Sequence, residues 1–191
     1  MAIMNRHAAF LGSDMPAHIG IELEGLLDRL EKQAEPLRPE DLDLVSGALA
    51  KLFSVEADEV AILELRAAAK VLKFALPEKL RAVGTIPLSS SAALAARTAR
   101  ERRSDVVNNF AQSRHASVFE GVPLGRRRGV CIQKLMSAPI LQGGNVVGVA
   151  QICHKGESQV ECGPDFKPAD LKTLQGLNDL LARFLALPRA A

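Results

Sequence analysis

Three cysteines and one neighbouring histidine are the residues of this sequence that first suggest covalent chemistry. Cys131, Cys153 and Cys162 form an odd set without C-x-x-C spacing, which argues against a disulfide framework or a closed zinc site. Cys131 and Cys153 lie in apolar runs, where burial makes a thiol inert, and Cys162 has acidic neighbours. His154 follows Cys153, but neighbours on a strand point to opposite faces and do not readily share a proton. We therefore expect no thiol catalysis and no metal site.

A second group of chemistry-bearing residues lies in the polar stretch 106–128. This stretch has no clear period, and loops of its length inside a compact domain are usually functional. We expect it to contact a polar or anionic ligand through Asn109, Ser113, Arg114, His115 and Ser117. The alternative for His115 is a solvated or hydrogen-bonded side chain, which is the commoner state of a lone loop histidine.

Composition limits the classes of partner. The chain has 191 residues, of which 48% are hydrophobic, so it can bury one substantial core with an extension. The formal charge of +2 supplies no strong attraction to nucleic acid or anionic lipid, and the absence of Trp and Tyr argues against stacking on bases. No stretch approaches the roughly 18 apolar residues of a membrane span, and the N-terminus lacks a signal peptide. We expect a soluble, cytoplasmic protein without nucleic-acid or membrane partners.

Two amphipathic helices are predicted within residues 1–54. Asp14 and Pro16 are start signals for the first helix, and the PED tripeptide at 39–41 opens the second. The first helix carries an apolar stripe at helical spacing, made of Ile19, Leu23, Leu26, Leu27 and Leu30. These helices form an N-terminal extension.

The remaining chain alternates strands and helices. The runs 59–65 and 70–76 are short and rich in branched or aromatic residues, which predicts adjacent strands. The runs 131–141 and 145–153, joined by a QGG turn, predict a hairpin. A helix is expected at 93–103, and a leucine-rich helix opens near Pro168 and runs to Pro188.

The order of these segments resembles the GAF family. The resemblance covers 55–187 and is sharpest in IPLSSSAALAARTA, Ile86 to Ala99, and LMSAPILQGGNVVGVAQICHKG, Leu135 to Gly156. It implies an α/β (α+β) fold, with a central antiparallel sheet, the N- and C-terminal helices on one face and a small-molecule pocket on the other. It also implies two parts, the helical extension 1–54 and a sensor domain 55–191. GAF domains bind cyclic nucleotides, tetrapyrroles, amino-acid derivatives or no known ligand, so the cofactor stays unknown.

A motif of cyclic-nucleotide-binding GAF domains, N-K followed by F-x-x-x-D-E, is only partly present. Lys155, Phe166 and Asp170 match it, whereas His154 replaces the asparagine and Leu171 the final glutamate. A lysine ending a strand and an aspartate in the first turn of the next helix are able to pair and fix the loop between them. We expect a structural contact between Lys155 and Asp170 rather than nucleotide recognition.

The sequence favours a regulatory domain over an enzyme. We expect a GAF-type sensor that binds a small polar ligand and signals in trans, because no catalytic, kinase or DNA-binding segment follows. One alternative is a thiol enzyme similar to free methionine sulfoxide reductase, although that family's cysteine neighbourhood is absent. The other is a ligand-free dimerisation scaffold.

A homodimer is also expected. The apolar stripes of the first and last helices are wider than one sheet face requires, and pairing them across a two-fold axis would bury the surplus. The residues predicted to carry this interface are Leu23, Leu27, Leu174 and Leu181. The alternative is that the first helix folds back onto its own domain.

Overall fold

A six-stranded sheet with helices on both faces organises the molecule. The structure is a computed structural model that describes residues 17–33, 35–112 and 131–189. The helices of this part are α1 (Ala17–Gln33), α2 (Pro39–Phe53), α3 (Leu94–Glu101), α4 (Pro168–Gly176) and α5 (Asn178–Ala186). The strands are β1 (Val60–Arg66), β2 (Val71–Leu76), β3 (Thr85–Pro87), β4 (Asp105–Val107), β5 (Cys131–Gln142) and β6 (Asn145–Gly156). No helix of this part is long and apolar enough to cross a membrane.

The sheet is antiparallel throughout, in the order β3-β2-β1-β6-β5-β4. Its two longest strands, β5 and β6, form the predicted hairpin. Gly143 and Gly144 have φ values of 56° and 79°, so the turn requires a left-handed conformation at two successive positions, which glycine adopts without steric cost. The predicted mixed fold, an antiparallel sheet with flanking helices and a helical N-terminal segment, is confirmed.

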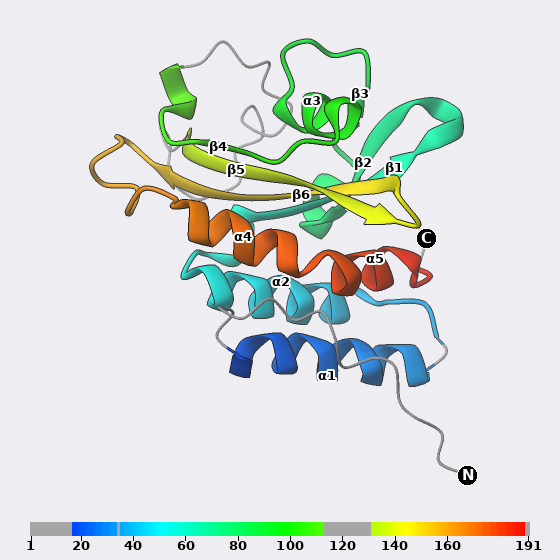
Figure 1. Cartoon of the computed structure of the whole chain (residues 1–191). Helices are drawn as coiled ribbons and strands as arrows, with labels where there is room; N and C mark the ends of the chain where they lie inside the picture. The colour runs from blue at the N-terminus through cyan, green and yellow to red at the C-terminus, as the bar shows by residue number, and fades with distance from the viewer. Residues whose placement is uncertain (1–16, 34, 113–130, 190–191) are drawn as a thin grey trace.

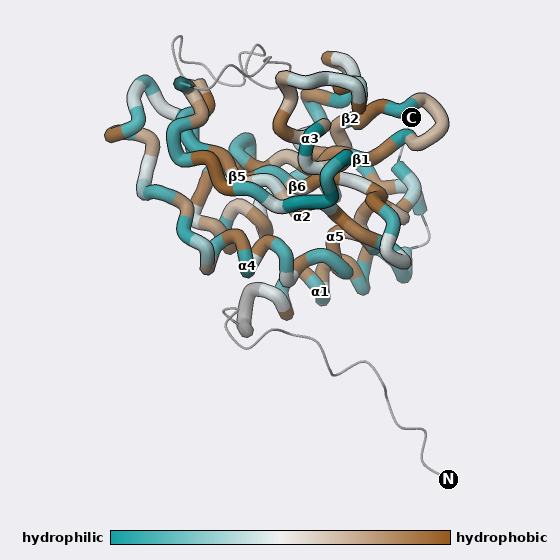
Figure 2. The backbone as a smooth tube through the Cα atoms, turned by 45° about the horizontal axis from the view of Figure 1, so that its top comes forward, coloured by the Kyte–Doolittle hydropathy of each residue, from teal (hydrophilic) through white to brown (hydrophobic). Residues whose placement is uncertain are grey.

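The sheet separates two apolar clusters. In Figure 1, α2, α4 and α5 lie on one side of the sheet and α3 on the other. The first cluster lies between the sheet and α1, α2, α4 and α5, and the second lies between the sheet and α3. Successive side chains of β6 point to opposite faces of the sheet, so this strand contributes to both clusters. Ala150 and Ile152 belong to the first cluster, and Val149 and Cys153 belong to the second. In Figure 2 apolar and polar residues recur in turn along α1 and α5, as expected for helices with one buried side.

The first helix folds back onto its own chain. Leu23 and Leu27 of α1 are buried in the same cluster as Leu174 of α4 and Leu181 of α5. Ion pairs from Arg183 of α5 to Asp28 and Glu31 of α1, at 2.6 Å and 2.7 Å, reinforce this packing. The four leucines predicted to hold a dimer are therefore occupied within one chain. The dimer itself, and the boundary drawn after residue 54, stay predictions.

The C-terminal segment is two helices rather than the single helix predicted. The break falls at Leu177, where ψ is 1°, directly after Gly176. Asn178 explains it: the side-chain oxygen accepts the Leu141 N–H at 2.7 Å and the side-chain nitrogen donates to the Leu141 carbonyl at 2.9 Å. This pairing satisfies the end of β5, and a glycine in a helix interior is poorly favoured. The interruption therefore serves a backbone contact that the apolar pattern does not reveal.

Candidate functional site

Three polar side chains lie buried on the sheet face that α3 covers. Ser137 of β5 and Gln151 of β6 are directly opposed in register, so their side chains share a face. Thr98 of α3 lies over them, with its hydroxyl 2.8 Å from the Ser137 hydroxyl. The Gln151 side-chain amide donates to the same Ser137 oxygen at 3.2 Å. This polar trio, Thr98, Ser137 and Gln151, connects the helix to the centre of the sheet.

The surroundings of the polar trio are apolar. Leu135, Val149 and Cys153 are buried in the same cluster, and α3 contributes mainly alanines. A hydroxyl or amide moved from water into such surroundings costs free energy unless it is hydrogen-bonded, and each bond returns only about 0.5–1.5 kcal/mol net. The trio therefore fixes the position of α3 on the sheet.

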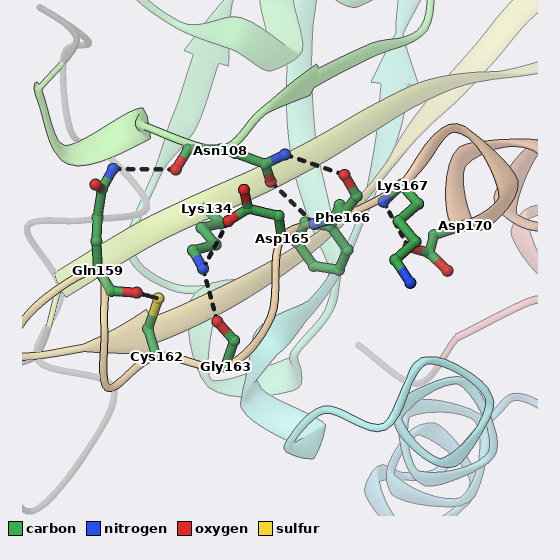
Figure 3. A network of polar contacts seen from close by, with 9 residues as sticks. All are labelled: Asn108, Lys134, Gln159, Cys162, Gly163, Asp165, Phe166, Lys167 and Asp170. Carbon is green, nitrogen blue, oxygen red and sulfur yellow. Dashed lines mark hydrogen bonds and ion pairs between the residues drawn. The ribbon is translucent and has the colours of Figure 1, made fainter.

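The loop between β6 and α4 is fastened to β5 (Figure 3). Lys134 of β5 is nearly buried, and its ammonium donates to the Gly163 carbonyl at 2.6 Å and pairs with Asp165 at 2.8 Å. Cys162 donates its S–H to the Gln159 carbonyl at 3.2 Å. One lysine therefore organises the central part of this loop.

Asn108, just after β4, holds the end of that loop (Figure 3). Its side-chain oxygen accepts the Phe166 N–H and its side-chain nitrogen donates to the Phe166 carbonyl, both at 3.0 Å. The amide thus satisfies both backbone groups of Phe166, as the backbone of a neighbouring strand does in a sheet. Gln159 in turn donates to the Asn108 carbonyl at 3.0 Å. The segment that begins the predicted ligand loop and the loop after β6 therefore position each other.

The predicted ligand residues are only partly within the described structure. Asn109 is exposed, next to the Asn108 contact and immediately before the short helical turn Phe110–Gln112. Phe110 is buried in the α3-face cluster and anchors this segment there. The other four predicted contacts, Ser113, Arg114, His115 and Ser117, lie outside the described residues. All five ligand contacts therefore stay predictions.

A family model described as GAF domain matches residues 40–185. The chain belongs to the GAF domain family. This match begins within α2 and ends within α5, so it takes in both faces of the sheet. No curated protein matches the chain.

Solved structures share the GAF architecture at low identity. The GAF domain of an Acinetobacter phosphoenolpyruvate-protein phosphotransferase is 15% identical, with a TM-score of 0.53 over 84% of this chain and 93% of that one. A methyl-accepting chemotaxis protein fragment, residues 122 to 287, is 16% identical, with a TM-score of 0.59 over 84% and 94%. Free methionine-R-sulfoxide reductase from Neisseria meningitidis, in complex with its substrate, is 16% identical, with a TM-score of 0.57 over 93% and 95%. At these identities the likeness establishes the fold alone.

The three thiols of this GAF domain occupy different settings. Cys153 is fully buried on the α3 face, and burial raises its pKa well above the ordinary value. Cys162, which the sequence places in an acidic loop, is buried as well, and burial raises its pKa. Cys131 is exposed at the start of β5, so the apolar setting predicted for it is wrong.

Lys155 pairs with a different carboxylate from the one predicted. Its ammonium contacts the Asp58 carboxylate at 3.3 Å and also donates to the Asp58 carbonyl. Asp170 instead accepts the Lys167 N–H at 2.6 Å, at the start of α4 (Figure 3). The lysine therefore ties β6 to the turn before β1, and the aspartate caps its own helix. The predicted pairing of Lys155 with Asp170 is therefore wrong, because each side chain contacts a different part of the chain.

Sequence reasoning missed the polar trio and the clamp made by Asn108. A signal for the trio was present, because Ser137 and Gln151 interrupt apolar strands at positions that the predicted hairpin places opposite each other. No local pattern identifies Asn108, whose partner Phe166 is 58 residues away. Among the described residues no group of three or more His, Cys, Asp or Glu side chains is placed to hold a metal ion.

Proposed function

We propose that this GAF domain is a regulatory module that binds a small polar ligand on the α3 face of its sheet and passes its state to a separate partner protein. The observation that carries the proposal is the polar trio of Thr98, Ser137 and Gln151 in an otherwise apolar cluster. The proposal includes a cytoplasmic location, because three cysteines outside any disulfide fit a reducing compartment.

The chemistry of the trio supports a particular ligand class. Replacing a buried, hydrogen-bonded polar set by apolar groups of the same shape is often neutral or stabilising, so stability alone gives little reason to retain one. Hydroxyls and an amide both donate and accept, and none of the three side chains is charged. The set therefore suits an uncharged or zwitterionic molecule with amide, hydroxyl or carbonyl groups. The segment around Asn109 borders this face through Phe110.

A ligand screen with matched variants tests the proposal. Amino acids and amino-acid oxides, which fit this class, and cyclic nucleotides, which carry a negative charge and serve as the comparison, are added separately to the purified chain, and the melting temperature is measured. A ligand at about 100 times its Kd stabilises the folded state by about 2.7 kcal/mol, which raises Tm by several degrees. The hit is then repeated on Gln151→Leu and Ser137→Ala, with Lys70→Gln as an exposed control on the β1–β2 hairpin.

The expected result is a Tm shift that Gln151→Leu and Ser137→Ala abolish and Lys70→Gln preserves. Lowered Tm in the two trio variants with an unchanged ligand shift would assign the trio to holding α3 alone. If no compound shifts the Tm of the parent chain, the ligand-free scaffold becomes the better interpretation.

We further propose that the protein is not a thiol reductase, although one relative of this fold is a free methionine-R-sulfoxide reductase. Two of the three thiols are buried, and burial disfavours the thiolate that such chemistry needs. The test is NADPH consumption with free methionine sulfoxide and a thioredoxin system. Turnover above background that disappears in Cys131→Ser would contradict this proposal, because Cys131 is exposed.

A further inference from the structure

A cavity of about 300 Å³ lies on the sheet face opposite the polar trio, where the end of α5 meets β1 and β2. Its walls come from Glu64 and Arg66 of β1, Lys73 to Ala75 of β2, Arg81, and the segment 185–189. Figure 1 shows the end of α5 beside this end of the sheet. The volume is at the lower end of the range for small-molecule pockets.

The charges around this cavity are unbalanced. Four cations, Arg66, Lys73, Arg81 and Arg189, surround one carboxylate, Glu64. Arg66 and Arg189 both pair with the same Glu64 oxygen, each at 3.1 Å. One acidic group therefore serves two guanidinium groups, and the cavity keeps an excess of positive charge.

Arg189 is held rigidly in the wall. Its side chain is only 9% exposed and lies over the Phe184 ring, with the guanidinium carbon 5.0 Å from the ring centre. One terminal nitrogen donates to the Phe184 carbonyl at 3.2 Å, and Leu37 pairs with the backbone of Arg189. Burial lowers the pKa of Arg189, and the nearby cations Arg81 and Arg66 act in the same direction.

The Nε atom of Arg189 is buried and has no hydrogen-bond partner among the described residues. Leaving such a donor unpaired costs free energy, and the cost is larger for a charged group. Guanidinium groups recognise phosphate and carboxylate oxygens through paired N–H donors. An anionic oxygen in the cavity would accept hydrogen bonds from the guanidinium and ammonium groups that line it and would reduce the repulsion among these cations.

We propose that this cavity binds a small organic phosphate monoester. A phosphate group carries about −1.5 to −2 charges at neutral pH, which matches the excess of cations better than one carboxylate does. The apolar part of the ligand would lie against wall residues such as Ala75, Leu185 and Leu187. This site is separate from the α3 face, so its success or failure leaves the function proposed above unaffected.

Isothermal titration of the whole chain tests the site with three probes. Phenyl phosphate combines the charge with an apolar ring, inorganic phosphate has the charge alone, and benzoate replaces the phosphate by a carboxylate. We expect phenyl phosphate to bind with a Kd of about 1 mM or tighter at low salt, ahead of both other probes, and to weaken as salt is added.

Variants locate the binding. Arg66→Gln and Lys73→Gln each remove one cation from the wall, and each should weaken phenyl phosphate binding about tenfold, as expected for a hydrogen bond to a charged group. Arg29→Gln makes the same charge change at an exposed position of α1 outside the cavity and should leave the Kd within about twofold. Arg189→Gln should abolish binding, with circular dichroism used to verify that this variant folds.

Three outcomes would overturn the proposal. The first is no binding of phenyl phosphate at 10-fold above the expected Kd, about 10 mM. The second is equal weakening by Arg66→Gln, Lys73→Gln and Arg29→Gln, which would indicate a general charge effect. The third is tighter binding of benzoate than of phenyl phosphate, which would assign the site to carboxylates.

Discussion

The imidazole of His154 stacks on the ring of Phe166, with the ring centres 4.4 Å apart and the planes inclined by 7°. His154 belongs to β6 and Phe166 to the loop before α4, so the stack joins the last strand to the start of the C-terminal helices. Gly163 passes close by, because a Cβ at that position would lie 3.2 Å from His154 Nδ1. The loop therefore encloses a titratable ring, and burial lowers the pKa of His154 from 6.5.

This stack predicts a loss of stability at mildly acidic pH. Because the pKa of His154 is lower in the folded chain, the unfolded chain takes up its proton at higher pH. The stabilisation is complete above about pH 6.5 and is lost as the pH falls through the folded-state pKa. His154→Phe keeps a ring on Phe166 but cannot be protonated. Its free energy of unfolding, measured in urea from about pH 7.5 to about pH 5, should fall less steeply than that of the parent chain.

The carboxylates provide an internal comparison. The Arg38 backbone N–H lowers the pKa of Asp41, so that group loses its contribution only at still lower pH, and it does so in both proteins. Equal slopes for His154→Phe and the parent chain would show that His154 does not set the acid sensitivity.

Much of this fold follows from local sequence pattern. Alternating residues at 70–76 and the Gly143–Gly144 turn specify strands and their connection, because side-chain period and left-handed turns are local properties. Contacts between residues far apart in the sequence do not follow from local pattern. The pairing of Lys155 with Asp58 spans 97 residues, and Asp170 was as reasonable a partner from spacing alone. The role of a polar side chain inside an apolar strand, such as Gln151, is evident only in the folded structure, where α3 packs over it.

The packing of the first helix gives a second prediction. Leu27 is fully buried, so Leu27→Ala should cost about 2–5 kcal/mol in the free energy of unfolding, and Leu27→Glu should unfold α1 or the whole chain. Glu24, on the same helix, is exposed, and Glu24→Ala should change stability by no more than about 0.5 kcal/mol. Urea denaturation followed by circular dichroism measures both. A folded, stable Leu27→Glu protein would show that α1 does not pack on its own chain.

The homodimer requires a separate measurement. With the predicted leucines buried, the exposed apolar side chains Ile21 and Leu44 of α1 and α2 are the candidates for an interface. We expect size exclusion with light scattering to give about twice the 20.5 kDa of one chain, and Ile21→Glu with Leu44→Glu to halve that mass without unfolding. A parent mass near 20.5 kDa at micromolar concentration would exclude the dimer.

The thiols should differ in reactivity. Cys131 is exposed, whereas Cys153 and Cys162 are buried and burial raises the pKa of both. Iodoacetamide at pH 8 should therefore modify Cys131 first in the folded chain, and all three in urea, because alkylation requires an accessible thiolate. Peptide mass spectrometry at successive times measures the order in which the three cysteines are alkylated. Equal labelling of Cys153 and Cys131 without denaturant would mean that the α3 face opens on the time scale of the reaction.

Gly148 and Gly25 make a pair in which the same substitution should have opposite effects. A Cβ on Gly148 of β6 would overlap the Leu63 carbonyl oxygen and the Leu185 side chain, so the bare backbone is what lets α5 approach the sheet. Gly148→Ala should therefore destabilise the chain by about 1–3 kcal/mol, as overpacking commonly does. Gly25 lies in the middle of α1, where an added Cβ would meet nothing within 4 Å, and Gly25→Ala should stabilise by about 0.5–1 kcal/mol through helix propensity. Urea midpoints of the two variants, compared with the parent chain, measure both signs. If Gly148→Ala were as stable as Gly25→Ala, the close packing of α5 on β6 would have to relax without cost, and the position of the cavity wall at Leu185 would not depend on this glycine.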